Sequence, residues 1–268
     1  MAIRVVVNGG AGRMGGRVLA HLLEDPELLL VGVREFSGHP AQGLDAGRVA
    51  GKEDLGVRVV AHLSGVGSEI DAVVDFSLPA ATIELAGEVA ARKAALVTGT
   101  TGLGGEERQA LMDLAREVPC VLAPNMSVGV NLLFKIAADV ARTLGDGYDV
   151  EIVEAHHRFK VDAPSGTAVR LAHEIARARG VPLDENACYG REGKPGPRKP
   201  DEIGILAVRA GDIVGEHTVL FGGLGERLEL VHRAHTRDNF ALGALRALKW
   251  VVKQPAGLYD MMDVLGLR

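Results

Sequence analysis

Apolar residues follow two different patterns along the chain. In the first half, short and nearly continuous apolar runs occupy residues 3–7, 28–33, 72–74, 95–97 and 120–123. Between them, apolar residues recur every three or four positions, as Met14, Val18 and Leu22 do within residues 13–24, which is typical of amphipathic helices. Strands that are apolar throughout and alternate with helices indicate a parallel sheet covered on both faces. Residues 36–68 fit neither pattern and give no clear prediction.

The pattern changes after Pro124. We predict helices over residues 128–144, 165–179 and 240–252, with Gly180 ending the second. Strands joined by glycine-rich turns are predicted at residues 149–155, 203–209, 216–221 and 227–231. Strands that alternate between apolar and polar positions are typical of a sheet with one exposed face. The expected fold class is therefore α/β, with a parallel-sheet domain first and a C-terminal α+β domain with an open mixed sheet after it.

Composition narrows the range of partners. The chain has 268 residues, of which 47% are hydrophobic and 24% charged, and its net charge is -5. An acidic balance argues against nucleic acid or an anionic membrane as the main partner. The N-terminus reads as a strand and not as a secretory signal, and the two cysteines, Cys120 and Cys188, do not suggest a disulfide framework. We expect a cytoplasmic protein.

A glycine-rich turn follows the first predicted strand. In "VVVNGGAGRMGG", Gly10, Gly12 and Gly15 form a G-x-G-x-x-G pattern directly before a helix, and Glu35 lies 20 residues beyond Gly15. This is the arrangement in which helix amides bind a pyrophosphate and a carboxylate binds the ribose. The alternative is a turn that binds nothing, with Glu35 as a surface charge. We favour a Rossmann-type dinucleotide-binding domain.

Glu35 also bears on the choice of cofactor. A carboxylate accepts hydrogen bonds from a ribose 2′-hydroxyl but repels a 2′-phosphate, which prefers arginine. Phe36 is uncharged, and Arg34 should point to the other side of the strand. We therefore expect NADH to be preferred, with NADPH possible. Two further segments that follow strands, "VTGTTG" (residues 97–102) and "DFSLP" (residues 75–79), could border the cofactor or could be ordinary turns.

The segment "EAHHRFKVDAPSGTA" (residues 154–168) contains the most chemistry. Its histidines lack the spacing of a zinc site, and Ser165 lacks the context of a nucleophile. One remaining interpretation is an anion site, in which Ser165, Gly166 and Thr167 open a helix and His156, His157 and Lys160 add charge and acid–base groups. The other is a solvated loop with Ser165 as a helix cap. The residues alone do not separate the two.

Five segments together resemble the dihydrodipicolinate reductase (4-hydroxy-tetrahydrodipicolinate reductase) family of lysine and diaminopimelate biosynthesis. They are "GGAGRMG", "GTTG", "NMSVGVN", "EAHHRFKVDAPSGTA" and "RAGDIVGEHTV", in the family's order and near its spacing. The resemblance implies a Rossmann domain in residues 1–127, completed by residues 240–268, and a domain for substrate binding and tetramerisation in residues 128–239. It implies reduction of a small cyclic dicarboxylate by hydride from NAD(P)H with loss of water, at a site that forms when the domains close.

The resemblance also assigns roles to residues. His156 would be the catalytic proton donor and Lys160 a second donor. His157, Ser165, Gly166 and Thr167 would bind the substrate carboxylates, with Arg237 as a further contributor, and no metal is implied. The implied cofactor contacts are Gly9, Gly10, Ala11, Gly12, Arg13, Met14, Glu35, Phe36, Gly99, Thr100, Thr101, Ala123, Pro124, Asn125 and Met126. Many members carry arginine where Phe36 stands and some carry it at Leu78, which again favours NADH here.

Two other functions are compatible with parts of the chain. Another two-domain nicotinamide dehydrogenase of the aspartate pathway would share the first domain, but an aspartate-semialdehyde type needs a nucleophilic cysteine, and Cys120 lies in an apolar run. A non-catalytic nucleotide sensor would have no reason to keep His156 and Lys160 beside an anion-binding turn. Both hypotheses predict no reduction of the condensation product of pyruvate and aspartate semialdehyde.

Overall fold

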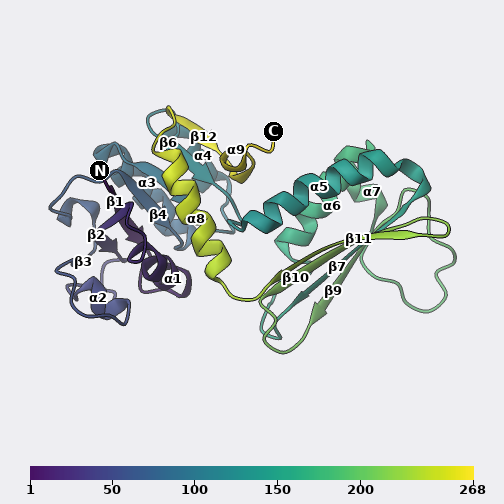
Figure 1. The fold of residues 1–268 in the computed structure, drawn as a ribbon, viewed down its shortest axis with the longest axis horizontal. Helices are drawn as coiled ribbons and strands as arrows, with labels where there is room; N and C mark the ends of the chain where they lie inside the picture. The colour runs from purple at the N-terminus through teal and green to yellow at the C-terminus, as the bar shows by residue number, and fades with distance from the viewer. The chain divides into compact units, whose positions relative to one another are not determined.

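The chain forms two compact units in the computed structural model, which describes all residues 1–268 (Figure 1). The first unit comprises Met1–Val128 and Arg237–Arg268, and the second comprises Gly129–Thr236. The last segment of the chain thus belongs to the same unit as the first.

The first unit is built on a seven-stranded sheet in which every pair of neighbouring strands is parallel. The strand order is β12-β6-β5-β4-β1-β2-β3. The sequence prediction of a Rossmann-type parallel sheet is therefore confirmed. The strands are β1 (Ile3–Asn8), β2 (Leu28–Arg34), β3 (Val59–Val60), β4 (Ala72–Asp75), β5 (Ala95–Thr98), β6 (Pro119–Leu122) and β12 (Gly257–Tyr259).

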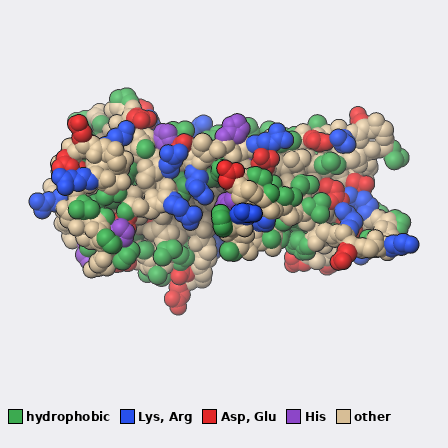
Figure 2. Space-filling view, turned by 90° about the horizontal axis from the view of Figure 1, so that it is seen from below, with side chains coloured by type: hydrophobic (Ala, Val, Ile, Leu, Met, Phe, Trp, Pro, Cys, Tyr) green, Lys and Arg blue, Asp and Glu red, His purple; other side chains and the backbone are tan.

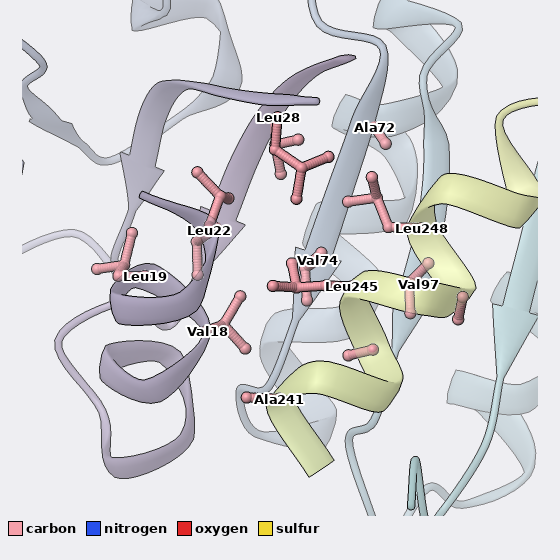
Figure 3. Packing of buried hydrophobic residues seen from close by; sticks show 14 of the residues in the cluster. Val18, Leu19, Leu22, Leu28, Ala72, Val74, Val97, Ala241, Leu245 and Leu248 are labelled. Atoms are coloured by element: carbon pink, nitrogen blue, oxygen red, sulfur yellow. The ribbon is translucent and has the colours of Figure 1, made fainter. Parts of the chain in front are cut away.

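Helices cover both faces of this sheet because alternate strand residues are buried on opposite sides. Val5, Val7 and Val74 pack with α1 and α8, as Figure 3 shows for Val74, whereas Val6 and Val73 pack with α3 and α4. The helices of the unit are α1 (Arg13–Leu22), α2 (Ala46–Val49), α3 (Pro79–Arg92), α4 (Gly105–Leu114), α8 (Asp238–Val251) and α9 (Met261–Leu265), with a 3₁₀ turn at η1 (Leu63–Gly65).

The second unit has a five-stranded mixed sheet in the order β11-β10-β7-β9-β8. β10 is antiparallel to both of its neighbours, whereas β9 is parallel to β7 and β8. The strands are β7 (Asp149–His156), β8 (Ala187–Cys188), β9 (Ile203–Arg209), β10 (Gly215–Gly222) and β11 (Arg227–Ala234). The helical segments are α5 (Val128–Leu144), η2 (Gly145–Gly147), α6 (Gly166–Arg179) and α7 (Leu183–Asn186).

One face of this sheet is covered and the other is open. Val150 and Ile152 of β7 and Val219 and Phe221 of β10 are fully buried in one cluster with apolar residues of α5 and α6. The residues between them on β10, such as Leu220, are only partly buried. The predicted open mixed sheet is therefore confirmed.

Several elements differ from the sequence prediction. The helix predicted at residues 240–252 begins at Asp238, and the unassigned segment 36–68 contains α2 and β3. β12 and α9 were not predicted. Elements of two to five residues are too short to show a periodic pattern, which explains why they were missed.

The face of the molecule seen in Figure 2 shows no strong separation of charge. Figure 2 shows basic and acidic side chains interspersed on the visible face, with hydrophobic side chains among them. None of the helices combines the length and the apolar character that crossing a bilayer would require.

Candidate active site

The glycine-rich turn between β1 and α1 is tightly constrained by its own backbone. Gly9 has a φ of 74°, and the N–H of Gly12 donates to the carbonyl of Gly9 at 3.0 Å. A Cβ on Gly15 would lie 2.0 Å from the carbonyl oxygen of Gly9, and a Cβ on Gly10 would lie 2.5 Å from Val33. Only glycine fits at Gly10 and Gly15, because any side chain would push the helix away from the strand.

The start of α1 fits a phosphate group. Its N-cap is Gly12, which supplies no side-chain acceptor, and its first turn contains no acidic residue. The first-turn amides therefore lack a side-chain partner at the positive end of the helix dipole. Ala11, Gly12 and Arg13 are exposed, whereas Met14 packs against the core. Of the predicted contacts in this turn, residues 11–13 thus face solvent and can meet a dinucleotide.

Glu35 lies beside this turn at the end of β2. Its side chain is 7% exposed, and its Oε1 accepts from the backbone N–H of Ala11 at 2.7 Å. Arg34 points to the other side of the strand, where its guanidinium donates to Glu88 and to Asn8. Phe36 is 57% exposed, with its ring edge-on to His39. The carboxylate therefore borders the glycine turn, and the adjacent arginine is directed away from it.

Asp75, at the end of β4, connects three strand ends. This fully buried carboxylate accepts from Asn8 Nδ2 at 2.7 Å and from Ser77 Oγ at 2.6 Å. It also accepts from the hydroxyls of Thr98 and Thr100, at 2.8 and 2.9 Å. The segment "DFSLP" was predicted either to border the cofactor or to be an ordinary turn, with no role for Asp75. A buried acidic residue at a strand end is the signal that could have found it.

The remaining predicted cofactor residues also follow strands of this sheet. Gly99 and Thr101 flank Thr100 after β5, and a Cβ on Gly99 would lie 2.3 Å from the ring of Phe76. Ala123, Pro124, Asn125 and Met126 follow β6, with Pro124 exposed and Met126 buried. Because parallel strands end at one edge, the sheet gathers the turns after β1, β2, β5 and β6 at its carboxyl edge, where α/β sheets bind their ligands.

His156 is the last residue of β7, in the second unit. Its Nδ1 lies 2.7 Å from Glu154 Oε2, and its ring is edge-on to that of His217 at 5.3 Å. Burial lowers the pKa of His156, Glu154 raises it, and Lys160 and Arg209 lower it, so that the net pKa lies below 6.5. A Cβ on Gly215 would lie 3.1 Å from Nε2. The absence of a side chain at Gly215 leaves room beside this nitrogen, although the His156 side chain is only 12% exposed.

The start of α6 presents a second set of helix amides. Ser165 is the N-cap, and its buried hydroxyl accepts from the N–H of Ala168 at 3.2 Å. Gly166 is exposed, and a Cβ there would meet nothing within 4 Å. Thr167 is half-buried beside it. The Ser165 cap and an anion site are compatible, because the cap uses one amide and leaves open space over Gly166.

The loop between β7 and α6 carries the two remaining predicted cations. Lys160 is 21% exposed and forms an ion pair with Asp162 at 2.8 Å. His157 is half-buried, near the ring of Phe159. Arg237, predicted as a further contributor, is the N-cap residue of α8 and belongs to the first unit.

Three side chains around His156 were not predicted. Glu154 is fully buried, Arg209 donates to both of its carboxylate oxygens at 2.7 Å, and His217 Nε2 lies 3.2 Å from Ser165 Oγ. Burial lowers the pKa of His217 to about 3. Glu154 stands two residues before His156 on one strand, so alternation alone places both on one face. Arg209 and His217 come from other strands, and although both lie in the segment "RAGDIVGEHTV", its local pattern gives neither side chain a role beside His156.

Elsewhere, one group of side chains has a geometry that a metal ion could use. His62, Glu84 and Glu88 bring their ligand atoms together on the first unit. Arg34 pairs with both carboxylates, at 3.2 and 2.7 Å, and already compensates their charge. The group is therefore an ion-pair cluster around a buried arginine.

The fold and these two sets of residues define a class, the pyridine-nucleotide-dependent oxidoreductases with a Rossmann unit and a separate α+β unit. Two family models match the chain: dihydrodipicolinate reductase, N-terminus, over residues 3–126, and dihydrodipicolinate reductase, C-terminus, over residues 129–265. The chain belongs to the dihydrodipicolinate reductase family.

Curated relatives are similar along their whole length. A 4-hydroxy-tetrahydrodipicolinate reductase from Syntrophus aciditrophicus (strain SB) is 52% identical over 266 residues, which cover 99% of each chain. The protein of the same name from Geotalea uraniireducens (strain Rf4) is 51% identical over 99% of this chain and 100% of its own. The predicted family, and with it an NAD(P)H-dependent reductase, is thereby confirmed.

Solved structures agree at the level of the fold. A dipicolinate-bound dihydrodipicolinate reductase from Paenisporosarcina sp. TG-14 superposes with a TM-score of 0.78 at 27% identity, over 98% of this chain and 99% of its own. An amine dehydrogenase from Mycobacterium smegmatis superposes with a TM-score of 0.60 over 97% of this chain and 95% of its own, but is only 16% identical. The second similarity shows a shared fold and no more.

Proposed function

We propose that the chain reduces 4-hydroxy-tetrahydrodipicolinate to tetrahydrodipicolinate with loss of water, in lysine and diaminopimelate biosynthesis, with His156 as proton donor. The assignment of residues rests on one observation in the second unit. His156, an acid–base group, lies beside the start of α6, and there is open space over Gly166. The relatives' name supports the reaction, and the dipicolinate bound to the Paenisporosarcina enzyme supports a dicarboxylate ligand.

The protein's own side chains and amides can donate the proton and hold the substrate in this reaction. Bound NAD(P)H supplies the hydride. Addition of a hydride to an imine-type ring leaves negative charge, which a positioned acid neutralises. His156 offers Nε2 for this purpose, and Lys160 lies close enough to lower its pKa. The amides of Gly166 and Thr167 and the hydroxyls of Ser165 and Thr167, with His157 nearby, hold the carboxylates.

Activity is tested with the condensation product of pyruvate and aspartate semialdehyde as substrate. We expect NADH oxidation that depends on this compound, and a fall in kcat of about 10²–10⁴-fold in His156→Ala, as for loss of a general acid. Lys160→Ala should also lower kcat. Lys135→Ala, which removes a partly exposed lysine of α5 that pairs with Asp139, serves as the control. Absence of oxidation would exclude the proposed reaction, and full activity in both site variants would exclude the assigned residues.

The chain's cofactor preference is proposed to be NADH. Glu35 lies beside the glycine turn, and the two positions where many or some family members carry arginine hold the exposed, uncharged Phe36 and Leu78. Phe36→Arg should raise kcat/KM for NADPH by about tenfold, which corresponds to one charge-assisted contact of roughly 1.4 kcal/mol. Equal kcat/KM values for the two cofactors in the wild type would contradict the preference.

The two units also suggest how the chain is organised and assembled. We infer a cytoplasmic homotetramer, with the first unit as the cofactor-binding domain and the second as the domain for substrate binding and oligomerisation. The open face of the mixed sheet supports the last point, because an uncovered sheet face is suited to burial between subunits. Sedimentation velocity of the purified chain tests it, and a monomer at micromolar concentration would contradict it.

A further inference from the structure

Glu154 is a buried carboxylate with four donors around it. Its side chain is fully buried, and Oε2 accepts from His156 Nδ1 at 2.7 Å and from Arg209 at 2.7 Å. Oε1 accepts from a second nitrogen of Arg209 at 2.7 Å and from the backbone N–H of Ser165 at 2.9 Å. One side chain thus contacts both the proposed proton donor and the residue that begins α6.

The carboxylate is ionised. Burial raises the pKa of Glu154, but hydrogen bonds from Arg209, His156 and Ser165 outweigh it and bring the pKa below its ordinary value. Arg209 binds it in a bidentate manner, the geometry that best compensates a buried charge. Arg209 also donates to the carbonyl of Asp162 at 2.7 Å, so the same pair fixes the loop that leads to α6.

An ionised carboxylate can only accept, and this decides the state of the histidine. The hydrogen bond at Nδ1 requires the proton to be on Nδ1, which leaves Nε2 as the variable nitrogen of His156. Nε2 lies where Gly215 supplies no side chain. Nε2 is therefore the nitrogen that can exchange a proton with a ligand.

We propose that Glu154 is a positioning residue that orients His156 through Nδ1 and, through the amide of Ser165, fixes the start of the helix that holds the substrate carboxylates. The inference rests on the proposed function for the roles of His156 and α6. The buried charge of Glu154 thus contacts both the proposed acid, His156, and the start of α6, the proposed anion site. Arg209 is the counter-ion of this charge.

The charged groups around His156 should change its pKa in different directions when two of them are removed. Glu154 faces it from its own strand, Arg209 from β9, His217 from β10 and Lys160 from the following loop. Glu154 favours the imidazolium, whereas Arg209 and Lys160 disfavour it. Loss of the carboxylate should therefore lower the pKa of His156, and loss of the arginine should raise it. If Glu154 and Arg209 merely supported the fold, their loss would not shift the pKa of His156 in opposite directions.

The first experiment follows the ¹⁵N and ¹H signals of the His156 ring by NMR during a pH titration, without substrate or cofactor. In Glu154→Gln we expect the pKa to fall by about one unit and the neutral ring to move toward the Nε2–H tautomer. In Arg209→Gln the pKa should rise. Glu151→Gln is the matched control, because Glu151 is on the same strand and pairs with Arg191 and Arg198, at 2.6 and 2.7 Å.

Kinetics then separate the two contacts of Glu154. Glu154→Gln should lower kcat at least tenfold and raise KM, whereas Glu154→Asp should recover part of kcat. In a His156→Ala background, the same Glu154→Gln change should leave kcat unaltered and still raise KM. An equal fall of kcat in that background, or a wild-type tautomer and pKa in Glu154→Gln, would overturn the proposal.

Two provisions keep the test decisive. If Glu154→Gln does not fold, Arg209→Gln decides by itself, because a pKa of His156 that stays unchanged or falls would contradict the proposal. If the wild-type chain shows no reductase activity, the proposed function fails, but the tautomer and the opposite pKa shifts still decide whether Glu154 controls His156.

Discussion

Glycine has opposite roles at the starts of α1 and α6. A Cβ on Gly15 would lie 2.0 Å from the carbonyl oxygen of Gly9, so glycine is required there by the protein itself. A Cβ on Gly166 would meet nothing within 4 Å, and the residue is exposed. The fold therefore does not need glycine at that position, and the missing side chain leaves room for a ligand to approach.

Gly166→Ala should therefore leave the protein folded and impair only binding. We expect a melting temperature equal to or above that of the wild type, because alanine loses less entropy in a helix by roughly 0.5–1 kcal/mol. The KM for the substrate should rise several-fold. Thermal unfolding and steady-state kinetics measure the two effects. Gly87→Ala, at an exposed helix position with nothing within 4 Å, is the control and should keep the wild-type KM. A wild-type KM in Gly166→Ala would exclude carboxylate binding there.

At the scale of single elements, α6 combines a structural cap with a candidate binding site. Ser165 Oγ accepts from the N–H of Ala168 and lies 3.2 Å from His217 Nε2, while the backbone N–H of Ser165 donates to Glu154. The first turn of the helix is thus fixed from three directions. This holds the first turn around Gly166 rigidly enough to select an anion.

Ser165→Ala should weaken stability and binding together. Loss of an N-cap costs about 1 kcal/mol of unfolding free energy, and the displaced first turn should raise the KM for the substrate. Urea unfolding and initial rates measure both quantities. The control is Asp260→Ala, which removes the cap of α9 in the first unit and should lower stability without changing that KM. A stability loss in Ser165→Ala with an unchanged KM would show a cap without a binding role.

At the scale of the whole molecule, the first unit is closed by the end of the chain. Leu245 and Leu248 of α8 are buried in the cluster that contains Val18 and Leu22 of α1 (Figure 3). The sheet that carries the proposed cofactor residues thus depends on a helix that begins more than 200 positions after β1 and β2.

Leu248→Ala should destabilise this unit strongly. Removing a fully buried leucine costs roughly 2–5 kcal/mol, because a cavity remains where the side chain packed. Urea denaturation gives the free energy of unfolding. Leu242→Ala on the same helix, where the leucine is 52% exposed, should change it by less than about 0.5 kcal/mol. Equal losses in the two variants would contradict the packing of α8.

Acid should destabilise the folded chain through His217. Burial lowers its pKa from 6.5 to about 3, so below pH 6.5 the unfolded chain binds a proton that the folded chain excludes. The stability that this group contributes is present above 6.5 and is lost as the pH falls toward 3, with a slope of at most about 1.4 kcal/mol per pH unit.

His217→Gln should flatten this dependence, since glutamine does not titrate and can still contact Ser165. Unfolding free energies at about pH 7 and about pH 5 measure the change. His173→Gln, which removes an exposed histidine from α6, should leave the slope unaltered. A steeper or unchanged slope in His217→Gln would show that His217 does not titrate as its burial requires.

The local pattern of apolar residues was sufficient to predict the limits of elements that are long or strongly periodic. Val128–Leu144 and Ile203–Arg209 have the predicted limits, and α6 begins after Ser165 and ends at Gly180 as expected. Short elements such as β3 and β12 escaped prediction, because a strand of two or three residues is defined by its neighbour and not by its own pattern.

By itself the sequence determined the fold class, the glycine turn, the position of Glu35 and the segment that carries His156, since each depends on residues close together in the chain. Only the tertiary structure decided the surroundings of His156. Strand register places Arg209 opposite His156 and His217 opposite Glu154. Those pairings join positions about 50 to 60 residues apart. They are set by burial of the whole sheet face, because shifting a strand by one residue would expose its core side chains.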